Sequence, residues 1–171
     1  MKIKANGIDI EVEDTGGTGP VVVLIMGLGM QLVAWPLQLV DALVAAGYRV
    51  IRHDNRDIGL SQKFDHKGVP NLVWESIKLK FGITPRAPYS LKDMALDTVG
   101  VLDALGVAQA HIVGASMGGM IAQRVALAAP GRTLSLTSIM STSGAKGLPN
   151  PKAHVIRTLL ARPKGQDREA I

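Results

Sequence analysis

The sequence predicts an α/β domain with a largely parallel sheet that begins with an antiparallel hairpin. Short apolar runs, which suit buried strands, alternate with stretches of helical periodicity. The dipeptide Asn6-Gly7 separates two segments of alternating apolar and polar residues, as in a tight hairpin. The stretch HIVGASMGGMIA (111–122) passes directly from an apolar run into a helical pattern. This indicates a strand, a tight turn and a helix.

In the first third of the chain we expect a hairpin at 3–5 and 8–13, a strand at 21–26, a helix at about 35–46 and a strand at 48–53. A polar loop (54–61) follows the last of these strands. The run at 21–26 consists of β-branched and other apolar residues, which is typical of a strand buried on both faces. Pro36 suits the first turn of the predicted helix, and Gly47 suits the position just past its end.

Helices and strands also alternate in the later part of the chain. We predict a helix at 90–105, a strand at 110–115, a helix at 117–129 and a strand at 134–140. Ser90 and Asp93 have the spacing of a capping box. Pro130 ends the helix that precedes the last strand, and Pro151 is typical of a further helix start. Residues 62–89 carry mixed signals, so we predict no element there.

Length and composition favour one globular, soluble domain, because 171 residues with 47% hydrophobic side chains are enough to form a core. The basic excess lies in the tail: six of the 19 Lys and Arg but only two of the 14 Asp and Glu follow residue 144. These basic residues are not interleaved with aromatics, so we expect no nucleic-acid partner. The absence of cysteine excludes a disulfide scaffold, thiolate metal sites and a cysteine nucleophile.

The N-terminal sequence MKIKANGIDIEVED has no apolar stretch of the kind found in a signal peptide, so we expect a cytoplasmic protein. No charged residue occurs between Asp14 and Asp41, a span long enough for a membrane helix. Prolines and glycines divide this span into a short strand pattern and a separate helical pattern. We therefore expect no membrane association.

The segment GASMG (114–118) fits the G-x-S-x-G nucleophile elbow, in which a serine occupies a strained turn between strand and helix. Gly114 and Gly118 suit this turn because a Cβ at either position would collide with neighbouring backbone. The turn lies at the carboxyl end of its strand, where open α/β sheets bind ligands and the first helical amides lack partners. Ser116 is therefore the candidate nucleophile. A purely structural turn of small residues fits the motif alone equally well.

Two interpretations fit the glycine loop that follows the strand at 21–26. Gly27 and Gly29 could open a dinucleotide fingerprint, with Asp54 binding a ribose, but Leu32 stands where the third glycine is required. Pro36 would also lie inside the helix of such a motif, which costs about 3 kcal/mol. In the other interpretation the loop contributes a backbone N–H to an oxyanion hole.

The second interpretation assigns the oxyanion hole to the N–H groups of Leu28 and Met117. At this point the chain resembles the N-terminal part of an α/β-hydrolase. The matching segments are VVVLIMGLG (21–29), HDNRDIGLS (53–61) and HIVGASMGG (111–119), in the order of that family and over nearly the whole chain. The segment MGLGMQLVAWP followed by DNRDIG is most similar to the branch of polyketide methylesterases such as aclacinomycin methylesterase.

The resemblance implies a truncated α/β-hydrolase fold that ends after the sixth strand, with a core at 1–145 and the start of a lid, or a basic tail, at 146–171. It implies a serine hydrolase that cleaves carboxylic esters through an acyl-enzyme on Ser116, with no cofactor and no metal. A non-catalytic hydrolase-fold binding protein is the alternative. Met26 stands where many relatives have histidine, and Asp57 where many have glycine. We expect Asp54 and Arg56 to pair and brace the loop beside the oxyanion hole.

In this family the catalytic acid and then the histidine follow the nucleophile. After Ser116 the sequence contains only His154, followed by Asp167 and Glu169, which is the reverse order. We therefore expect the isolated chain to be catalytically incomplete. The predicted last strand, Leu134 to Met140, is uncharged and free of proline, and in this fold two more strands follow it. We expect this edge to self-associate or to bind a complementing chain.

Overall fold

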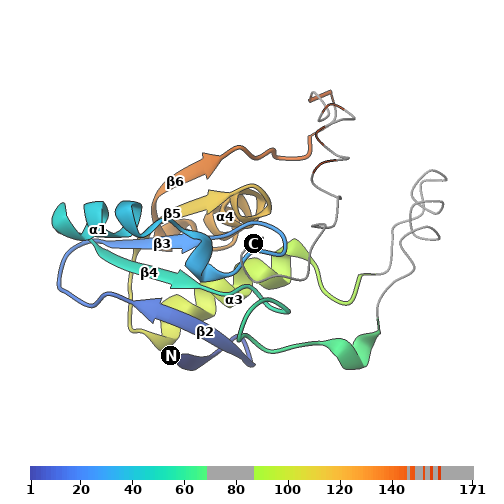
Figure 1. Ribbon diagram of the computed structural model, residues 1–171, viewed down its shortest axis with the longest axis horizontal. Helices are drawn as coiled ribbons and strands as arrows, with labels where there is room; N and C mark the ends of the chain where they lie inside the picture. Colours follow the sequence, from blue (N-terminus) through green and yellow to red (C-terminus); the bar gives the residue numbers. More distant parts are fainter. Residues whose placement is uncertain (69–86, 146, 149–151, 153–154, 156–157, 159–171) are drawn as a thin grey trace.

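A computed structural model describes residues 1–68, 87–145, 147–148, 152, 155 and 158 of the chain. Within these residues, strands form one sheet in the order β1-β2-β4-β3-β5-β6 (Figure 1). Their bounds are β1 (Lys2–Ala5), β2 (Ile8–Asp14), β3 (Val21–Ile25), β4 (Arg49–His53), β5 (Ala110–Ala115) and β6 (Thr133–Ile139). The pairs β1–β2 and β2–β4 are antiparallel, whereas the pairs β4–β3, β3–β5 and β5–β6 are parallel. The predicted hairpin and mostly parallel sheet are confirmed.

The described helices cover both faces of the sheet, as Figure 1 shows for α1 (Leu37–Ala45), α3 (Leu91–Ala104) and α4 (Met117–Ala128). All five residues of β3 are buried. Val23 belongs to the core cluster that includes Val101 of α3 and Ile121 of α4, whereas Leu24 belongs to the cluster with Val40 of α1. Burial on two faces explains why β3 is a continuous apolar run.

The start of α3 follows the predicted capping box. The Ser90 hydroxyl accepts a hydrogen bond from the Asp93 N–H at 3.3 Å, and the Asp93 carboxylate accepts one from the Ser90 N–H at 2.7 Å. The hydrogen bond from the Ser90 backbone holds the pKa of Asp93 below its usual value. These paired contacts satisfy two N–H groups that a helix start leaves without intrahelical partners.

The first helix begins later than predicted. Residues 32–34 form the short 3-10 turn η1 (Leu32–Ala34), and Trp35 and Pro36 have extended backbone angles before α1 begins at Leu37. The residue before a proline is disfavoured in the helical region, which explains why Trp35 stays outside the helix. The predicted helix start near Pro151 and nearly all of the predicted lid segment lie outside the described residues.

Candidate active site

Ser116 lies in the turn between β5 and α4, as the elbow motif predicts. Its backbone angles, φ 54° and ψ −121°, place it in a region that non-glycine residues rarely adopt, which costs on the order of 1–3 kcal/mol. The Ser116 N–H donates to the Ile139 carbonyl at 2.9 Å, and the Ser141 hydroxyl donates to the Ser116 carbonyl at 2.7 Å. The residue is exposed, and none of the described residues hydrogen-bonds to its Oγ. The surrounding contacts therefore fix the backbone while the hydroxyl stays accessible.

The two motif glycines are required by close backbone contacts. A Cβ at Gly114 would collide with the carbonyl of Gly118, and a Cβ at Gly118 would collide with the carbonyls of Ile25 and Met26. α4 therefore packs directly against the end of β3. This packing brings the loop that follows β3 close to Ser116.

Gly27 in that loop lies close to the serine. A Cβ at Gly27 would lie 3.1 Å from Ser116 Cβ and 3.6 Å from Ser116 Oγ. Leu28 follows Gly27, and Met117 is the first residue of α4. Within the described part of the chain, no acceptor is bound to the N–H of Leu28 or Met117. Met117 therefore follows the serine in the chain and Leu28 follows the glycine that lies close to it, and both amides are without an acceptor among the described residues.

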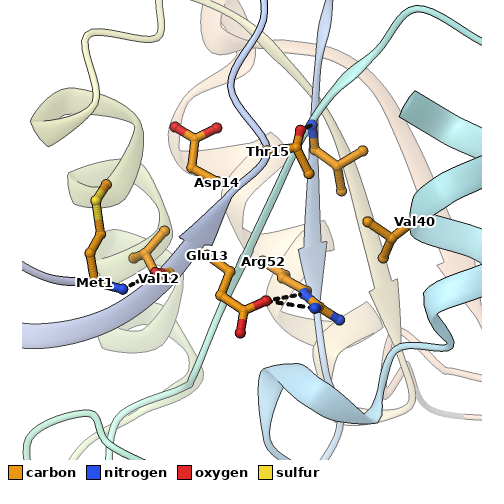
Figure 2. A pocket seen from close by; sticks show the side chains of 8 residues that line it. Met1, Val12, Glu13, Asp14, Thr15, Val40 and Arg52 are labelled. Atoms are coloured by element: carbon orange, nitrogen blue, oxygen red, sulfur yellow. Dashed lines mark hydrogen bonds and ion pairs between the residues drawn. The ribbon is translucent and has the colours of Figure 1, made fainter. Parts of the chain in front are cut away.

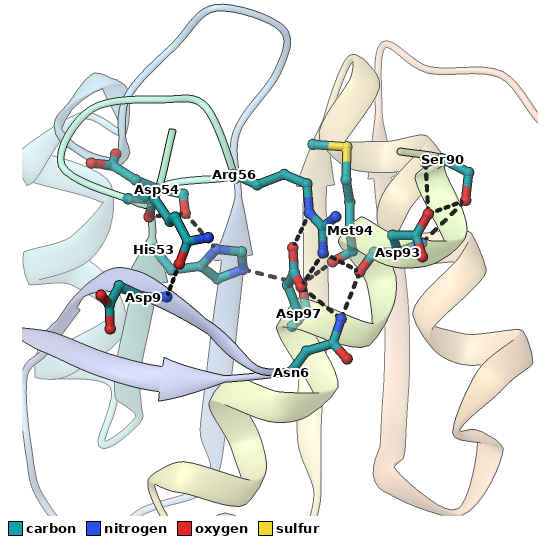
Figure 3. Close-up of polar contacts among 12 residues, drawn as sticks. Asn6, Asp9, His53, Asp54, Arg56, Ser90, Asp93, Met94 and Asp97 are labelled. Atoms are coloured by element: carbon teal, nitrogen blue, oxygen red, sulfur yellow. Dashed lines mark hydrogen bonds and ion pairs between the residues drawn. The ribbon is translucent and has the colours of Figure 1, made fainter. Parts of the chain in front are cut away.

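The pairing expected between Asp54 and Arg56 is wrong. The carboxylate oxygens of Asp54 accept from the backbone N–H groups of Leu32 at 2.7 Å and Leu60 at 2.9 Å. Arg56 instead binds Asp97 of α3, as Figure 3 shows. The sequence offers a weak signal for this partner, because Asp97 is the one charged residue among the buried positions of α3.

The dinucleotide interpretation of the glycine loop is also wrong. The helix begins at Leu37 and not within the glycine loop, and the residue before it is Pro36. The carboxylate of Asp54, which would have to bind the ribose, is occupied by two backbone amides. The loop after β3 therefore lacks the close connection to a helix that a pyrophosphate site needs.

The histidines of the described residues all lie in structural positions. His53 is 1% exposed, its Nε2 lies 3.1 Å from Thr98 Oγ1, and its burial lowers its pKa (Figure 3). His111 Nδ1 lies 2.8 Å from the hydroxyl of Ser135, and His66 packs against the ring of Phe64. None of these three imidazoles hydrogen-bonds to Ser116. His154 lies outside the described residues.

Two hollows are lined by segments that follow β3 and β6. One of about 400 Å³ is formed by the loop after β3 and is lined by Gly29, Met30, Gln31, Val33 and Ala34. Another of about 420 Å³ lies beside α4 and is lined partly by Met120 and by residues 142–144 that follow β6. Among the described residues, neither Ser116 nor Leu28 nor Met117 lines either hollow.

A third cavity, of about 360 Å³, lies away from the elbow between β2, β4 and α1 (Figure 2). The charged side chains that line it are already paired. Arg52 Nε lies 2.8 Å from the carboxylate of Glu13, and Asp14 accepts two hydrogen bonds from Arg49. The hydrogen bond from Arg49 holds the pKa of Asp14 below its usual value. With its charges satisfied, this cavity is a weaker candidate than the elbow.

Two further properties concern the described residues only. They contain no group of three or more His, Cys, Asp or Glu side chains placed to hold a metal ion. None of their helices combines the length and the apolar character needed to cross a membrane.

Comparisons with known proteins agree with this geometry. The family model of the alpha/beta hydrolase fold matches residues 20–168. Rhodomycin D methylesterase DauP of Streptomyces sp. (strain C5) is 33% identical over 167 aligned residues, covering 86% of this chain and 50% of DauP. Epoxide hydrolase B of Mycobacterium tuberculosis is 32% identical over 130 residues, covering 76% of this chain and 31% of that protein.

Among solved structures, the enol-lactonase from Burkholderia xenovorans LB400 superposes with a TM-score of 0.64 at 27% identity, covering 93% of this chain and 52% of the lactonase. The chain spans about half the length of the curated relatives it matches, including the methylesterases. The predicted resemblance to polyketide methylesterases is confirmed by DauP and by DnrP of Streptomyces peucetius. The chain belongs to the α/β-hydrolase family.

Proposed function

We propose that this chain is the N-terminal portion of a serine hydrolase that cleaves carboxylic esters through an acyl-enzyme on Ser116. The observation that carries the proposal is the position of Ser116. It is exposed in a turn with φ 54°, and the loop after β3 comes so close that a Cβ at Gly27 would lie 3.1 Å from Ser116 Cβ and 3.6 Å from its Oγ. A strained, exposed serine beside free backbone amides is the arrangement that acyl transfer requires.

In the proposed reaction, Ser116 Oγ loses its proton to a base and attacks the ester carbonyl carbon. The carbonyl oxygen becomes an oxyanion that accepts hydrogen bonds from the N–H groups of Leu28 and Met117. Collapse of this intermediate breaks the bond to the alcohol, which leaves with a proton, and Ser116 retains the acyl group. Water then attacks the acyl-enzyme by the same route and releases the carboxylic acid.

We also propose that these 171 residues are catalytically incomplete by themselves. A serine hydroxyl is a poor nucleophile at neutral pH without a histidine within hydrogen-bond reach. His53, His66 and His111 all have other surroundings, and none of them bonds Ser116. His154 precedes the only later acids, Asp167 and Glu169, which reverses the order of the family. The base and the acid would then come from polypeptide outside this sequence, which agrees with the half-length coverage of the relatives.

An ester-cleavage assay tests this proposal. The purified 171-residue chain is expected to hydrolyse activated esters about a million-fold more slowly than a complete enzyme, the loss seen when a serine-protease triad is removed. Normal turnover that Ser116→Ala abolishes would show that the base lies within these residues, and His154→Ala would then be the first variant to compare. Cleavage that Ser116→Ala leaves unchanged would contradict the proposed nucleophile.

Strand β6 is the edge at which we expect a protein partner. Among the described strands β6 pairs only with β5, and six of its seven residues are exposed. Leu134 and Leu136 remain 47% and 42% exposed, and an apolar groove of about 310 Å³ runs beside Thr137 and Ile139 toward α1. We propose that this edge pairs with a second copy of the chain or with a chain that supplies further strands, because an uncharged open strand readily accepts another.

A further inference from the structure

The loop that carries Leu28 is connected to the end of β4 at two points. Asn55 Nδ2 donates to the carbonyl of Met26 at 2.9 Å, at the start of the loop. Asp54 Oδ1 accepts from the N–H of Leu32 at 2.7 Å, at the end of the loop. Asp54 and Asn55 are each 2% exposed. Two consecutive buried side chains therefore hold both ends of one exposed loop.

The bond from Asn55 fixes the peptide group that precedes Gly27. A peptide unit is planar, so holding the Met26 carbonyl also sets the direction of the Gly27 N–H and restricts rotation toward Leu28. Residue 26 is itself a methionine, whose thioether is only a weak acceptor and has no donor with which to hold the loop. The polar contact that orients the start of the loop is thus supplied by Asn55, in the loop after β4.

The bond from Asp54 depends in turn on the loop 54–61. The second carboxylate oxygen accepts from the Leu60 N–H at 2.9 Å, and a Cβ at Gly59 would collide with this carboxylate. Gly59 also has φ 50°, a conformation that glycine adopts without strain. The carboxylate is therefore clamped on both sides, which makes it a rigid anchor for Leu32.

We propose that Asn55 and Asp54 are positioning residues that hold the loop 26–32 so that the Leu28 N–H is directed at the oxyanion of a substrate on Ser116. This inference rests on the proposed function. The Asn55 Oδ1 is buried and has no hydrogen-bond partner in the described structure. A buried acceptor without a partner is unfavourable for folding. An asparagine at this position is therefore better explained by the orientation of Met26 than by stability.

The test compares three variants in the product of the complete natural reading frame. Asn55→Asp is isosteric and replaces the donor with an acceptor, and Asn55→Ala removes the side chain together with its unpaired oxygen. Thr98→Val is the matched control, because it deletes a buried hydrogen bond to His53 but does not touch the loop. Each variant is treated with a fluorophosphonate, and the maximal labelling rate at Ser116 is separated from the affinity for the reagent.

Loss of one oxyanion-hole donor lowers turnover on the order of 100- to 1000-fold, so a misdirected loop is expected to lower the maximal labelling rate at least about tenfold. Reagent affinity should change less than about threefold, and Thr98→Val should label like the parent. Hydrogen exchange of the Met30 and Leu32 amides should accelerate in both Asn55 variants. Parent-like labelling by a folded Asn55→Ala would overturn the inference.

Exchange separates this inference from the proposed function. If the parent protein itself fails to label at Ser116, the proposed nucleophile is wrong. Hydrogen exchange of the loop amides then shows by itself whether Asn55 holds the loop. Faster hydrogen exchange at Met30 and Leu32 in the Asn55 variants, but not in Thr98→Val, supports the role of the Asn55–Met26 hydrogen bond in holding the loop. Unchanged exchange in Asn55→Ala contradicts it. If Asn55→Asp does not fold, Asn55→Ala provides both measurements.

Discussion

Arg56 and Asp97 form a buried, bidentate ion pair between the loop after β4 and helix α3 (Figure 3). Arg56 Nε and Nη2 each lie 2.6 Å from an oxygen of the Asp97 carboxylate. The two side chains are 7% and 2% exposed. Asn6 Nδ2 also donates to Asp97 at 2.9 Å, so the carboxylate connects the N-terminal hairpin, the loop and the helix.

Asp97→Asn should lower the free energy of unfolding by about 3–5 kcal/mol, because it leaves the Arg56 charge buried without its counterion. Urea unfolding followed by circular dichroism measures this loss. Asp103→Asn is the control, because its pair with Arg132 spans a similar distance, 2.7 Å, but the Asp103 side chain is 61% exposed. The control should lose less than about 1 kcal/mol. Equal losses in the two variants would contradict the importance of burial here.

Gly118→Ala should destabilise the protein although alanine is the better helix former by about 1 kcal/mol. The added Cβ would collide with the backbone of Ile25 and Met26, which cannot move without disturbing β3. Gly131→Ala is the control, since a Cβ there meets no atom within 4 Å. Thermal unfolding should show a clear decrease for Gly118→Ala and little change for Gly131→Ala. A Gly118→Ala protein as stable as the parent would show that α4 does not pack this closely on β3.

Stability should fall as the pH is lowered below about 6.5, the ordinary pKa of histidine. Burial lowers the pKa of His53 in the folded protein, so below this pH the unfolded chain binds a proton that the folded chain does not. The resulting slope is at most about 1.4 kcal/mol per pH unit. His53→Gln retains a neutral polar group and should remove this part of the pH dependence. Urea unfolding at pH 7.5, 6.0 and 5.0 measures both proteins, and identical slopes would refute the assignment to His53.

Self-association of the 171-residue chain should depend on β6. Leu136→Lys places a charge on the exposed strand, which opposes pairing with another strand, and should shift the chain toward monomer. Leu127→Lys is the matched control, because Leu127 is 75% exposed on α4, away from the strand. Light scattering measures the mass of each variant. A parent that is monomeric at high concentration, with fast hydrogen exchange at 134–140, would contradict the proposed pairing.

The fold could be predicted because its signals are local. The hairpin follows from Asn6-Gly7, which adopts positive φ at both positions, and the elbow follows from two glycines whose absent Cβ atoms permit close packing. Alternation of buried strands and helices then gives the α/β class. Helix α1 begins at Leu37, two residues after the predicted start at Trp35. The reason is that Pro36 disfavours the helical conformation at Trp35, and this effect outweighs the apolar periodicity.

Long-range polar partners could not be predicted in the same way. Asp54 and Arg56 are two residues apart, and their opposite charges suggest a pair, but the chain geometry directs them to Leu32 and Asp97. The contact between Asn55 and Met26 likewise joins two different strand ends. Nothing in a linear sequence records which backbone carbonyl an amide side chain will meet. Such contacts depend on the register between β3 and β4, which only the folded sheet provides.

The most direct test of the central claim is to map the adduct that a fluorophosphonate forms on the product of the complete natural reading frame. We predict one modified peptide, which contains Ser116, and no modification of the Ser116→Ala variant. Circular dichroism of that variant should match the parent, so that loss of labelling reports on the nucleophile alone. An adduct on another residue, or an unmodified Ser116 in the folded protein, would contradict the assignment of this chain as the nucleophile-bearing part of a serine hydrolase.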